Sequence, residues 1–241
     1  MTHRPGHWVE VADRTFARRY AELDQTLGLV VGDEHCLVID TGSDERFGAE
    51  LAAAVREITA LPWTVMITHA HFDHFFGTRA FLPCPVWAHA RCRDVLADTA
   101  EQTRRDWAER YRGEGKADLA VLLEAAELVL PTGVFTQSIE LDLGGRAAVL
   151  LHPGPAHTDH DVAVHVPDVG VLFAGDLVEQ GAPPSVGSDA HLARWPDALD
   201  RLLELGPGTI VPGHGDPVDP EFVTRQRDAL RERHAAGDPG R

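Results

Sequence analysis

Four potential metal ligands are concentrated in one hexad, His69-Ala70-His71-Phe72-Asp73-His74, which follows the apolar run Thr64-Val65-Met66-Ile67. The apolar run is typical of a buried strand, so the hexad is expected where that strand ends. Residues two apart in an extended turn point the same way, so the first two histidines can bind one ion. The aspartate and the last histidine continue into the next turn and can reach a second ion. Imidazole and carboxylate groups suit zinc, iron or manganese, so the hexad predicts a metal centre rather than a His-rich surface turn.

The composition excludes several kinds of partner. The chain has 241 residues, of which 44% are hydrophobic, and this is enough for a sizeable core. Its formal net charge of −16 argues against a nucleic-acid groove and against docking on anionic lipid, because both need a basic face. We therefore expect a small-molecule substrate, with no nucleic-acid or membrane partner, and the sequence leaves a homodimer open.

Cysteine usage and the N-terminal residues favour a cytoplasmic protein. The three cysteines, Cys36, Cys84 and Cys92, are odd in number and irregularly spaced, so no disulfide framework is expected. The first ten residues contain no apolar leader, and no stretch reaches the roughly 18 apolar residues that span a bilayer.

The chain before the hexad is predicted to form a hairpin, a helix and a strand. Leu27–Val31 and Cys36–Ile39 are short apolar segments separated by a turn signal, which predicts antiparallel strands. Ser43 is a candidate N-cap for a helix that Pro62 ends. The strand Trp63–Ile67 then delivers the hexad.

A similar order recurs in the second half. Asp161–Val166 and Val171–Ala174 are predicted strands, and Gly175-Asp176 ends the second of them. A helix is expected to start near Pro196, and a last short strand delivers Pro212-Gly213-His214-Gly215.

Each half therefore places an acidic residue and a histidine at the carboxyl ends of strands. These residues are Asp40 and His69 in the first half and Asp176 and His214 in the second. Open α/β sheets collect their ligands at the edge formed by the carboxyl ends of the strands. We therefore predict an α/β fold in which these four side chains share one edge.

Two helical regions complete a single predicted domain, residues 1–241. Residues 91–130 are predicted to be mostly helical, with a break near 112–116, and form either a substrate-covering lid or an external helical pair. Residues 220–241 are predicted to be a C-terminal helix and a frayed tail, since 221–234 contain neither Gly nor Pro.

Three histidines compete to be a further metal ligand: His152, His157 and His160. We prefer His157, because it follows a Pro-Gly-Pro turn and precedes the next strand, in a loop at an element boundary. His152 is expected inside a strand as a packed residue, and His160 is a candidate substrate contact.

Together these motifs resemble those of the metallo-β-lactamase superfamily. The hexad, then His157, then Asp176 in Gly-Asp, then His214 in Pro-Gly-His-Gly follow that family's order, and residues 38–42 (Val-Ile-Asp-Thr-Gly) match its lead-in. The resemblance runs from about residue 27 to residue 216. It implies an αβ/βα sandwich, two mixed sheets face to face with helices on the outside, and a two-metal site on one edge.

The resemblance also implies a role for each ligand, in a set like that of glyoxalase II. It places His69, His71 and His157 on the first metal and Asp73, His74 and His214 on the second, with Asp176 bridging both. Asp40 would orient a ligand or the hexad by hydrogen bonding.

The chemistry expected of such a site is hydrolysis. Two cations about 3.5–4 Å apart can share one water and lower its pKa towards neutrality, which gives a bridging hydroxide. Asp73 could orient that water or take its proton, so Asp73 and Asp176 are the candidate catalytic residues. We expect zinc, with iron or manganese as alternatives. The cysteines are expected to be structural.

Four functions remain open at this point. The leading prediction is a dinuclear hydrolase of a small ester, thioester, lactone or amide. Within the family that the chain resembles, antibiotic-hydrolysing members typically carry Cys or Ser at the bridging position, so Asp176 makes β-lactamase activity an alternative. A mononuclear iron persulfide dioxygenase and a non-catalytic metal-binding scaffold are the others. Residues 181–190, with His191 and Trp195, and residues 91–130 would shape substrate selection.

Overall fold

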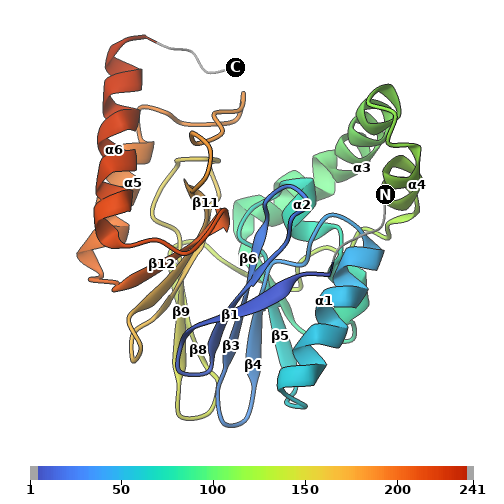
Figure 1. Ribbon diagram of the computed structural model, residues 1–241, viewed down its shortest axis with the longest axis horizontal. Coiled ribbons are helices and arrows are strands. Elements are labelled where there is room, and N and C mark those ends of the chain that lie inside the picture. The colour runs from blue at the N-terminus through green and yellow to red at the C-terminus, as the bar shows by residue number, and fades with distance from the viewer. Residues whose placement is uncertain (1–4, 238–241) are drawn as a thin grey trace.

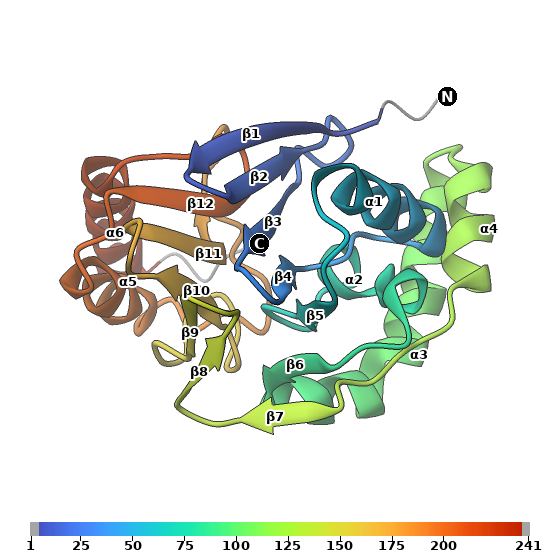
Figure 2. The same cartoon turned by 90° about the horizontal axis from the view of Figure 1, so that it is seen from below.

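Two β-sheets face one another and carry helices on their outer sides (Figures 1 and 2). The computed structural model describes residues 5–237. Within this range one sheet has seven strands in sequence order: β1 His7–Ala12, β2 Thr15–Arg19, β3 Thr26–Val31, β4 Cys36–Ile39, β5 Trp63–Met66, β6 Val86–His89 and β7 Gly133–Phe135. The second sheet has five, in the order β12-β11-β10-β9-β8: β8 Ser138–Asp142, β9 Ala147–Leu151, β10 Ala163–Val166, β11 Val171–Glu179 and β12 Thr209–His214.

The helices flank the two sheets on opposite sides, as Figure 2 shows. Their bounds are α1 Glu45–Ile58, α2 Phe72–Phe75, α3 Ala90–Gly113, α4 Ala117–Ala125, α5 Trp195–Glu204 and α6 Pro220–Ala235. One apolar cluster lies between the two sheets. A second lies between the seven-stranded sheet and its helices, and a third lies between the five-stranded sheet and its helices. The predicted αβ/βα sandwich is confirmed.

The repeated order of elements predicted for the two halves is present in the sheets. β3 and β4 pair antiparallel, and β5 then joins β4 in parallel. β10 and β11 likewise pair antiparallel, and β12 joins β11 in parallel. One detail of the prediction is wrong: Gly175-Asp176 does not end a strand, because β11 continues to Glu179. Register irregularities between β11 and β12, at Phe173/Gly175 and at Gly175/Glu179, interrupt the pairing around Asp176.

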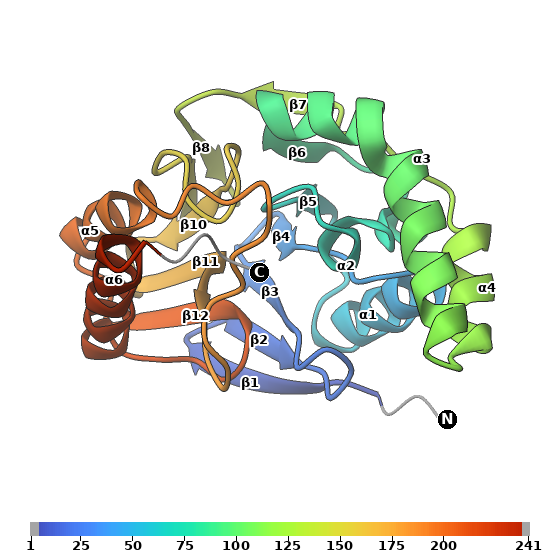
Figure 3. The ribbon, with the colours of Figure 1, turned by 90° about the horizontal axis from the view of Figure 1, so that it is seen from above.

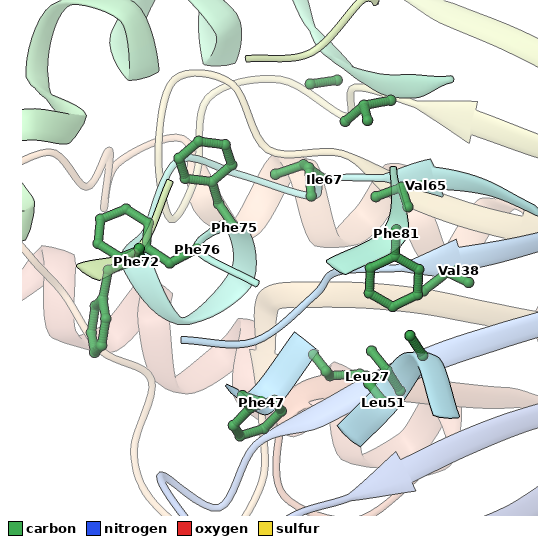
Figure 4. Close-up of a cluster of buried hydrophobic side chains, with 14 of the residues drawn as sticks. Leu27, Val38, Phe47, Leu51, Val65, Ile67, Phe72, Phe75, Phe76 and Phe81 are labelled. Atoms are coloured by element: carbon green, nitrogen blue, oxygen red, sulfur yellow. The ribbon is translucent and has the colours of Figure 1, made fainter. Parts of the chain in front are cut away.

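Helix α1 anchors the outer face of the seven-stranded sheet. Its N-cap is Asp44, whose carboxylate accepts a hydrogen bond from the Phe47 N–H at 2.9 Å, so the prediction of Ser43 as the cap is wrong by one residue. Phe47 and Leu51 of this helix lie in the cluster drawn in Figure 4, beside Leu27 and Val38 from the sheet. Burial of these side chains stabilises the sheet that delivers the hexad.

The helical region predicted for residues 91–130 is confirmed as α3 and α4, with a break at residues 114–116. Its role as a lid stays a prediction. The C-terminal helix is also confirmed, as α6, although the last four residues of the predicted tail lie outside the described residues. Strands β1, β2 and β6–β8 were not predicted, and β9 was expected only as the strand that would contain His152. No helix in residues 5–237 is both long and apolar enough to cross a membrane.

Candidate metal centre

The hexad covers the turn that follows β5 and the first three residues of helix α2. β5 ends at Met66, and the first two histidines of the hexad occupy the turn before α2. Three buried aromatic rings fix this short helix in the core: Phe72, Phe75 and Phe76 (Figure 4). Because these rings share one face of the turn, Asp73 and His74 are left to project elsewhere.

Four ligand atoms converge in a first group, His69, His71, His157 and Asp176. The Nε2 of His157 lies 3.0 Å from the Nδ1 of His71. The Asp176 Oδ2 lies 3.5 Å from that Nε2 and 3.7 Å from the Nε2 of His69. The ligand atoms of this group all lie within 4.8 Å of one another, so they can surround a single ion.

A second group consists of Asp73, His74 and His214. The Asp73 Oδ2 lies 3.6 Å from the Nε2 of His74 and 3.4 Å from the Nε2 of His214. Helix α2 supplies Asp73 and the end of β12 supplies His214, so the fold brings together two residues that are 141 positions apart in the chain.

The Asp176 carboxylate lies between the two groups. Besides its contacts in the first group, its Oδ1 lies 3.2 Å from the Nε2 of His74 and its Oδ2 lies 3.4 Å from the Nε2 of His214. The Asp176 side chain can lie here only because residue 213 is a glycine: a Cβ on Gly213 would overlap the Asp176 Oδ1. The glycine before His214 is thus required by the close approach of the aspartate.

Asp40 orients one histidine of each group through the ring nitrogen that faces away from the centre. Its Oδ2 accepts hydrogen bonds from the His74 Nδ1 and from the Thr68 Oγ1, each at 2.8 Å. The Thr68 Oγ1 in turn lies 3.0 Å from the His69 Nδ1. One buried carboxylate therefore orients His74 directly and His69 through a hydroxyl.

The remaining histidines have outer partners that the sequence did not reveal. The His71 Nε2 donates to Asp189 at 3.0 Å, the His157 Nδ1 donates to the Ser185 carbonyl at 3.2 Å, and the His214 Nδ1 donates to the Leu23 carbonyl at 2.8 Å. Asp189 lies in the Gly- and Pro-rich loop flagged for substrate selection, but no spacing linked it to His71. Two of the partners are backbone carbonyls, which residue types cannot signal.

Three polar atoms that face the centre have no hydrogen-bond partner among the described residues, and a bound metal ion would supply one. His69 Nε2, His74 Nε2 and Asp176 Oδ1 are buried and have no hydrogen-bond partner among residues 5–237. Burial lowers the pKa of His157 to about 4 and that of His69 well below its ordinary value, so both rings are neutral and can donate a lone pair. Buried, unpaired nitrogens and carboxylate oxygens around one point fit divalent cations.

The comparison with known families agrees with this geometry. A family model described as the metallo-beta-lactamase superfamily matches residues 22–214. The chain belongs to the metallo-β-lactamase superfamily. Its relatives are metal-dependent hydrolases, and the chain is an enzyme of that class. The resemblance seen in the motifs is confirmed.

Relatives of this superfamily member act on different substrates. The metallo-beta-lactamase type 2 of Bacillus cereus is 25% identical over 210 residues, which cover 85% of this chain and 72% of the relative. The acyl-coenzyme A thioesterase MBLAC2 of Homo sapiens is 26% identical over 213 residues, which cover 82% and 75%. Among solved structures, the metallo-β-lactamase FIM-1 from Pseudomonas aeruginosa in its mono-zinc form aligns with a TM-score of 0.74 at 19% identity, covering 96% of this chain and 97% of that one.

The three predicted substrate-binding residues of this metallo-hydrolase differ in their placement. His191 is exposed and lines an open pocket with residues 186–188, 190 and 192–194 and with His234. Trp195 is 0% exposed, and its Nε1 donates to the Leu177 carbonyl at 3.0 Å, so the prediction that it contacts substrate is wrong. Its ring instead packs on His157, with 5.4 Å between the ring centroids.

The two histidines passed over as ligands lie outside both ligand groups. The buried His160 accepts a hydrogen bond from the Ala70 N–H at 3.2 Å through Nε2, and its Nδ1 contacts Asp159 at 2.7 Å. His152 follows β9 rather than lying inside a strand, and its Nδ1 donates to the Asp161 carbonyl.

We expect His160→Ala to leave metal content unchanged. The substitution leaves the Ala70 N–H without its acceptor, which lowers the free energy of unfolding by about 1–3 kcal/mol. Plasma mass spectrometry and denaturant unfolding of both proteins measure these two effects. A fall in bound metal would show that His160, not His157, supplies the ligand.

Metal binding at the second group is expected to weaken as the pH falls. Although burial opposes it, Asp176 raises the pKa of His214 to about 12 and that of His74 well above its ordinary value. In the metal-free protein both rings therefore hold protons at neutral pH, and an incoming cation must displace them. Apparent affinity should fall by about tenfold per pH unit for each proton released. Calorimetric titration of stripped protein in buffers of different ionisation enthalpy measures this release, and a buffer-independent enthalpy would contradict it.

Proposed function

We propose that this chain is a dinuclear metal-dependent hydrolase of a small ester, thioester, lactone or amide, with two zinc ions. The observation that carries the proposal is the position of Asp176, whose carboxylate lies 3.2–3.7 Å from histidine nitrogens of both ligand groups. An aspartate in this position can hold two cations close enough to act on one substrate.

The ligands divide the chemical tasks between them. Two bound divalent ions would lower the pKa of a shared water and polarise a substrate carbonyl. Asp73 is buried, and although burial opposes it, His74 and His214 hold its pKa below the usual range. Its ionised carboxylate can accept a hydrogen bond from the attacking water or take its proton. Asp40, Asp189 and the two backbone carbonyls keep the histidine rings aimed at the centre.

The substrate class rests on the residue at the bridging position. Asp176 departs from the Cys or Ser typical of antibiotic-hydrolysing relatives, and an acyl-coenzyme A thioesterase is among the similar proteins. This combination favours thioesters and lactones. β-Lactam hydrolysis is the second candidate, because the Bacillus cereus enzyme matches over 85% of the chain.

Elemental analysis of the purified chain, with its visible spectrum, is the first test. About two zinc or manganese ions per chain support the proposal, and a panel of thioesters, lactones and β-lactams then separates the two candidates. One iron per chain would instead favour a persulfide dioxygenase, with oxygen consumption as its assay. A chain that binds no metal under any condition would overturn the proposal.

A further inference from the structure

One irregular loop supplies the outer partners of two histidines in the first ligand group. This β11–α5 loop, residues 180–194, contains Asp189, which accepts from the His71 Nε2, and Ser185, whose carbonyl accepts from the His157 Nδ1. The loop lies on the same side of the molecule as α2, as Figure 3 shows. The ring nitrogens of His74 and His214 are held by other parts of the fold, at Asp40 and Leu23. The loop is thus tied to the rings of one ligand group and not to those of the other.

A buried glutamate outside both ligand groups fixes this loop. Glu179, the last residue of β11, is 5% exposed. Its Oε1 accepts from the Ser185 N–H at 2.7 Å, and its Oε2 accepts from the Ser185 Oγ at 3.2 Å. These two bonds fold the loop back so that the carbonyl of the same serine meets His157.

The glutamate is itself anchored to helix α6. Its N–H donates to the Gln226 Oε1 at 3.2 Å, and the Gln226 Nε2 donates to the Leu177 carbonyl at 2.8 Å. A continuous set of hydrogen bonds therefore runs from the C-terminal helix, through the end of β11 and the loop, to His157. Trp195, which begins α5 directly after the loop, packs against the same histidine ring.

These contacts make the order of the loop depend on the metal site. A hydrogen bond to the outer nitrogen fixes the tautomer and direction of a ligating histidine. Ordering a segment without helix or strand costs conformational entropy, which a few bonds at Ser185 and Asp189 offset only in part. An ion that locks His71 and His157 in place therefore stabilises the loop, and the ordered loop stabilises the ion by the same free energy.

We propose that Glu179 and Asp189 are positioning residues that link occupancy of the His69/His71/His157/Asp176 group to the order of the β11–α5 loop. The inference rests on the proposed metal site but not on the identity of the substrate. It makes the two ions unequal: the loop holds two rings of the first group directly, whereas it reaches the second group only through the backbone of His214, whose carbonyl accepts from the Gln180 N–H at 2.9 Å.

Two substitutions remove the links, and two conservative ones retain them. Asp189→Ala and Glu179→Met delete the acceptors, whereas the amide oxygens of Asp189→Asn and Glu179→Gln can still accept from His71 and from Ser185. Competition with a chromophoric zinc chelator measures the two affinities. We expect the first pair of variants to lower the affinity for one of the two zinc ions by about 10- to 100-fold and to lower the affinity for the other much less. The second pair should stay close to the wild type.

Hydrogen exchange gives a readout that does not depend on activity. Amides of residues 180–194 should exchange faster in wild-type protein stripped of zinc than in zinc-loaded protein. In Asp189→Ala and Glu179→Met, these amides should need a higher zinc concentration than in the wild type before their exchange slows. Asp159→Ala is the matched control, because it removes a carboxylate–histidine bond of the same kind, to His160, which lies outside both ligand groups. It should leave both zinc affinities unchanged.

The outcomes separate this inference from the proposed function. A wild-type chain that binds no zinc contradicts the proposed function. Two other outcomes would overturn only the link, in a wild type that binds two zinc ions. In one, hydrogen exchange of the loop does not change when zinc is added; in the other, Asp189→Ala and Glu179→Met bind both ions with wild-type affinity. If either of those two variants does not fold, as judged by circular dichroism, the zinc dependence of exchange in the wild type decides the question alone.

Discussion

Asp176→Ala should lose at least one metal ion and most of the turnover while the chain stays folded. The side chain is the one that reaches both ligand groups, so its removal takes a ligand from each at once. The loss of one ion removes several kcal/mol of transition-state stabilisation, which lowers kcat/KM by about a hundredfold or more. Metal content by mass spectrometry, turnover on the best substrate and circular dichroism measure the three effects.

Two further variants interpret the result. Asp168→Ala is the control, because this aspartate lies at the β10–β11 turn and pairs with Arg146 rather than with a histidine. It should keep full metal content and rate. Asp176→Cys returns one ligand atom and should recover part of the metal content. If Asp176→Ala kept full occupancy and rate, the assignment of Asp176 as the bridging ligand would be wrong.

Asp40→Asn should weaken metal binding by about 10- to 100-fold with little change of shape. In the wild type the Asp40 Oδ2 accepts from the His74 Nδ1 and from the Thr68 Oγ1. Asparagine has one acceptor oxygen, which the Thr68 N–H requires at the Oδ1 position. The NH₂ then takes the Oδ2 position and cannot accept, so His74 is driven to the tautomer that carries its proton on Nε2, the atom that faces the centre. Because asparagine tolerates the positive φ of 62° at this residue, the backbone should stay as it is. Chelator competition measures the affinity.

Asp40→Ala should be destabilising as well. It leaves three buried donors, the Thr68 N–H, the Thr68 Oγ1 and the His74 Nδ1, without their acceptor. Each such donor costs about 1–3 kcal/mol, so the free energy of unfolding should fall by at least about 3 kcal/mol. Denaturant unfolding of metal-free protein measures this loss. Equal metal affinity and stability in all three proteins would show that Asp40 does not orient the ligands.

Much of the centre could be predicted because its signals are short-range. The hexad carries its ligands within six residues, and the apolar run before it predicts the strand that β5 supplies. The repeated hairpin–helix–strand order placed Asp40, His69, Asp176 and His214 at element ends. The fold brings the last three around one point and sets Asp40 against the outer nitrogen of His74. Spacing and periodicity of this kind do not depend on distant parts of the chain.

Predictions failed where packing competes with local pattern. Asp44 rather than Ser43 caps α1, because two neighbouring residues can both cap and only the packed backbone chooses. Trp195 follows a loop near the centre, yet it is fully buried against His157 and the five-stranded sheet. Gly175-Asp176 reads as the end of a strand, but pairing with β12 extends β11 beyond it.

The sequence by itself predicted the candidate metal ligands and their spacing, and it determined the αβ/βα order of elements and the superfamily. Only the tertiary structure decided which side chains hold the ligands in place. His71 meets Asp189 across 118 residues, His157 meets the Ser185 carbonyl, and His214 meets the Leu23 carbonyl. Local sequence encodes which atoms can bind a metal, whereas the contacts between distant loops exist only after the two sheets have packed and brought those loops to the same edge.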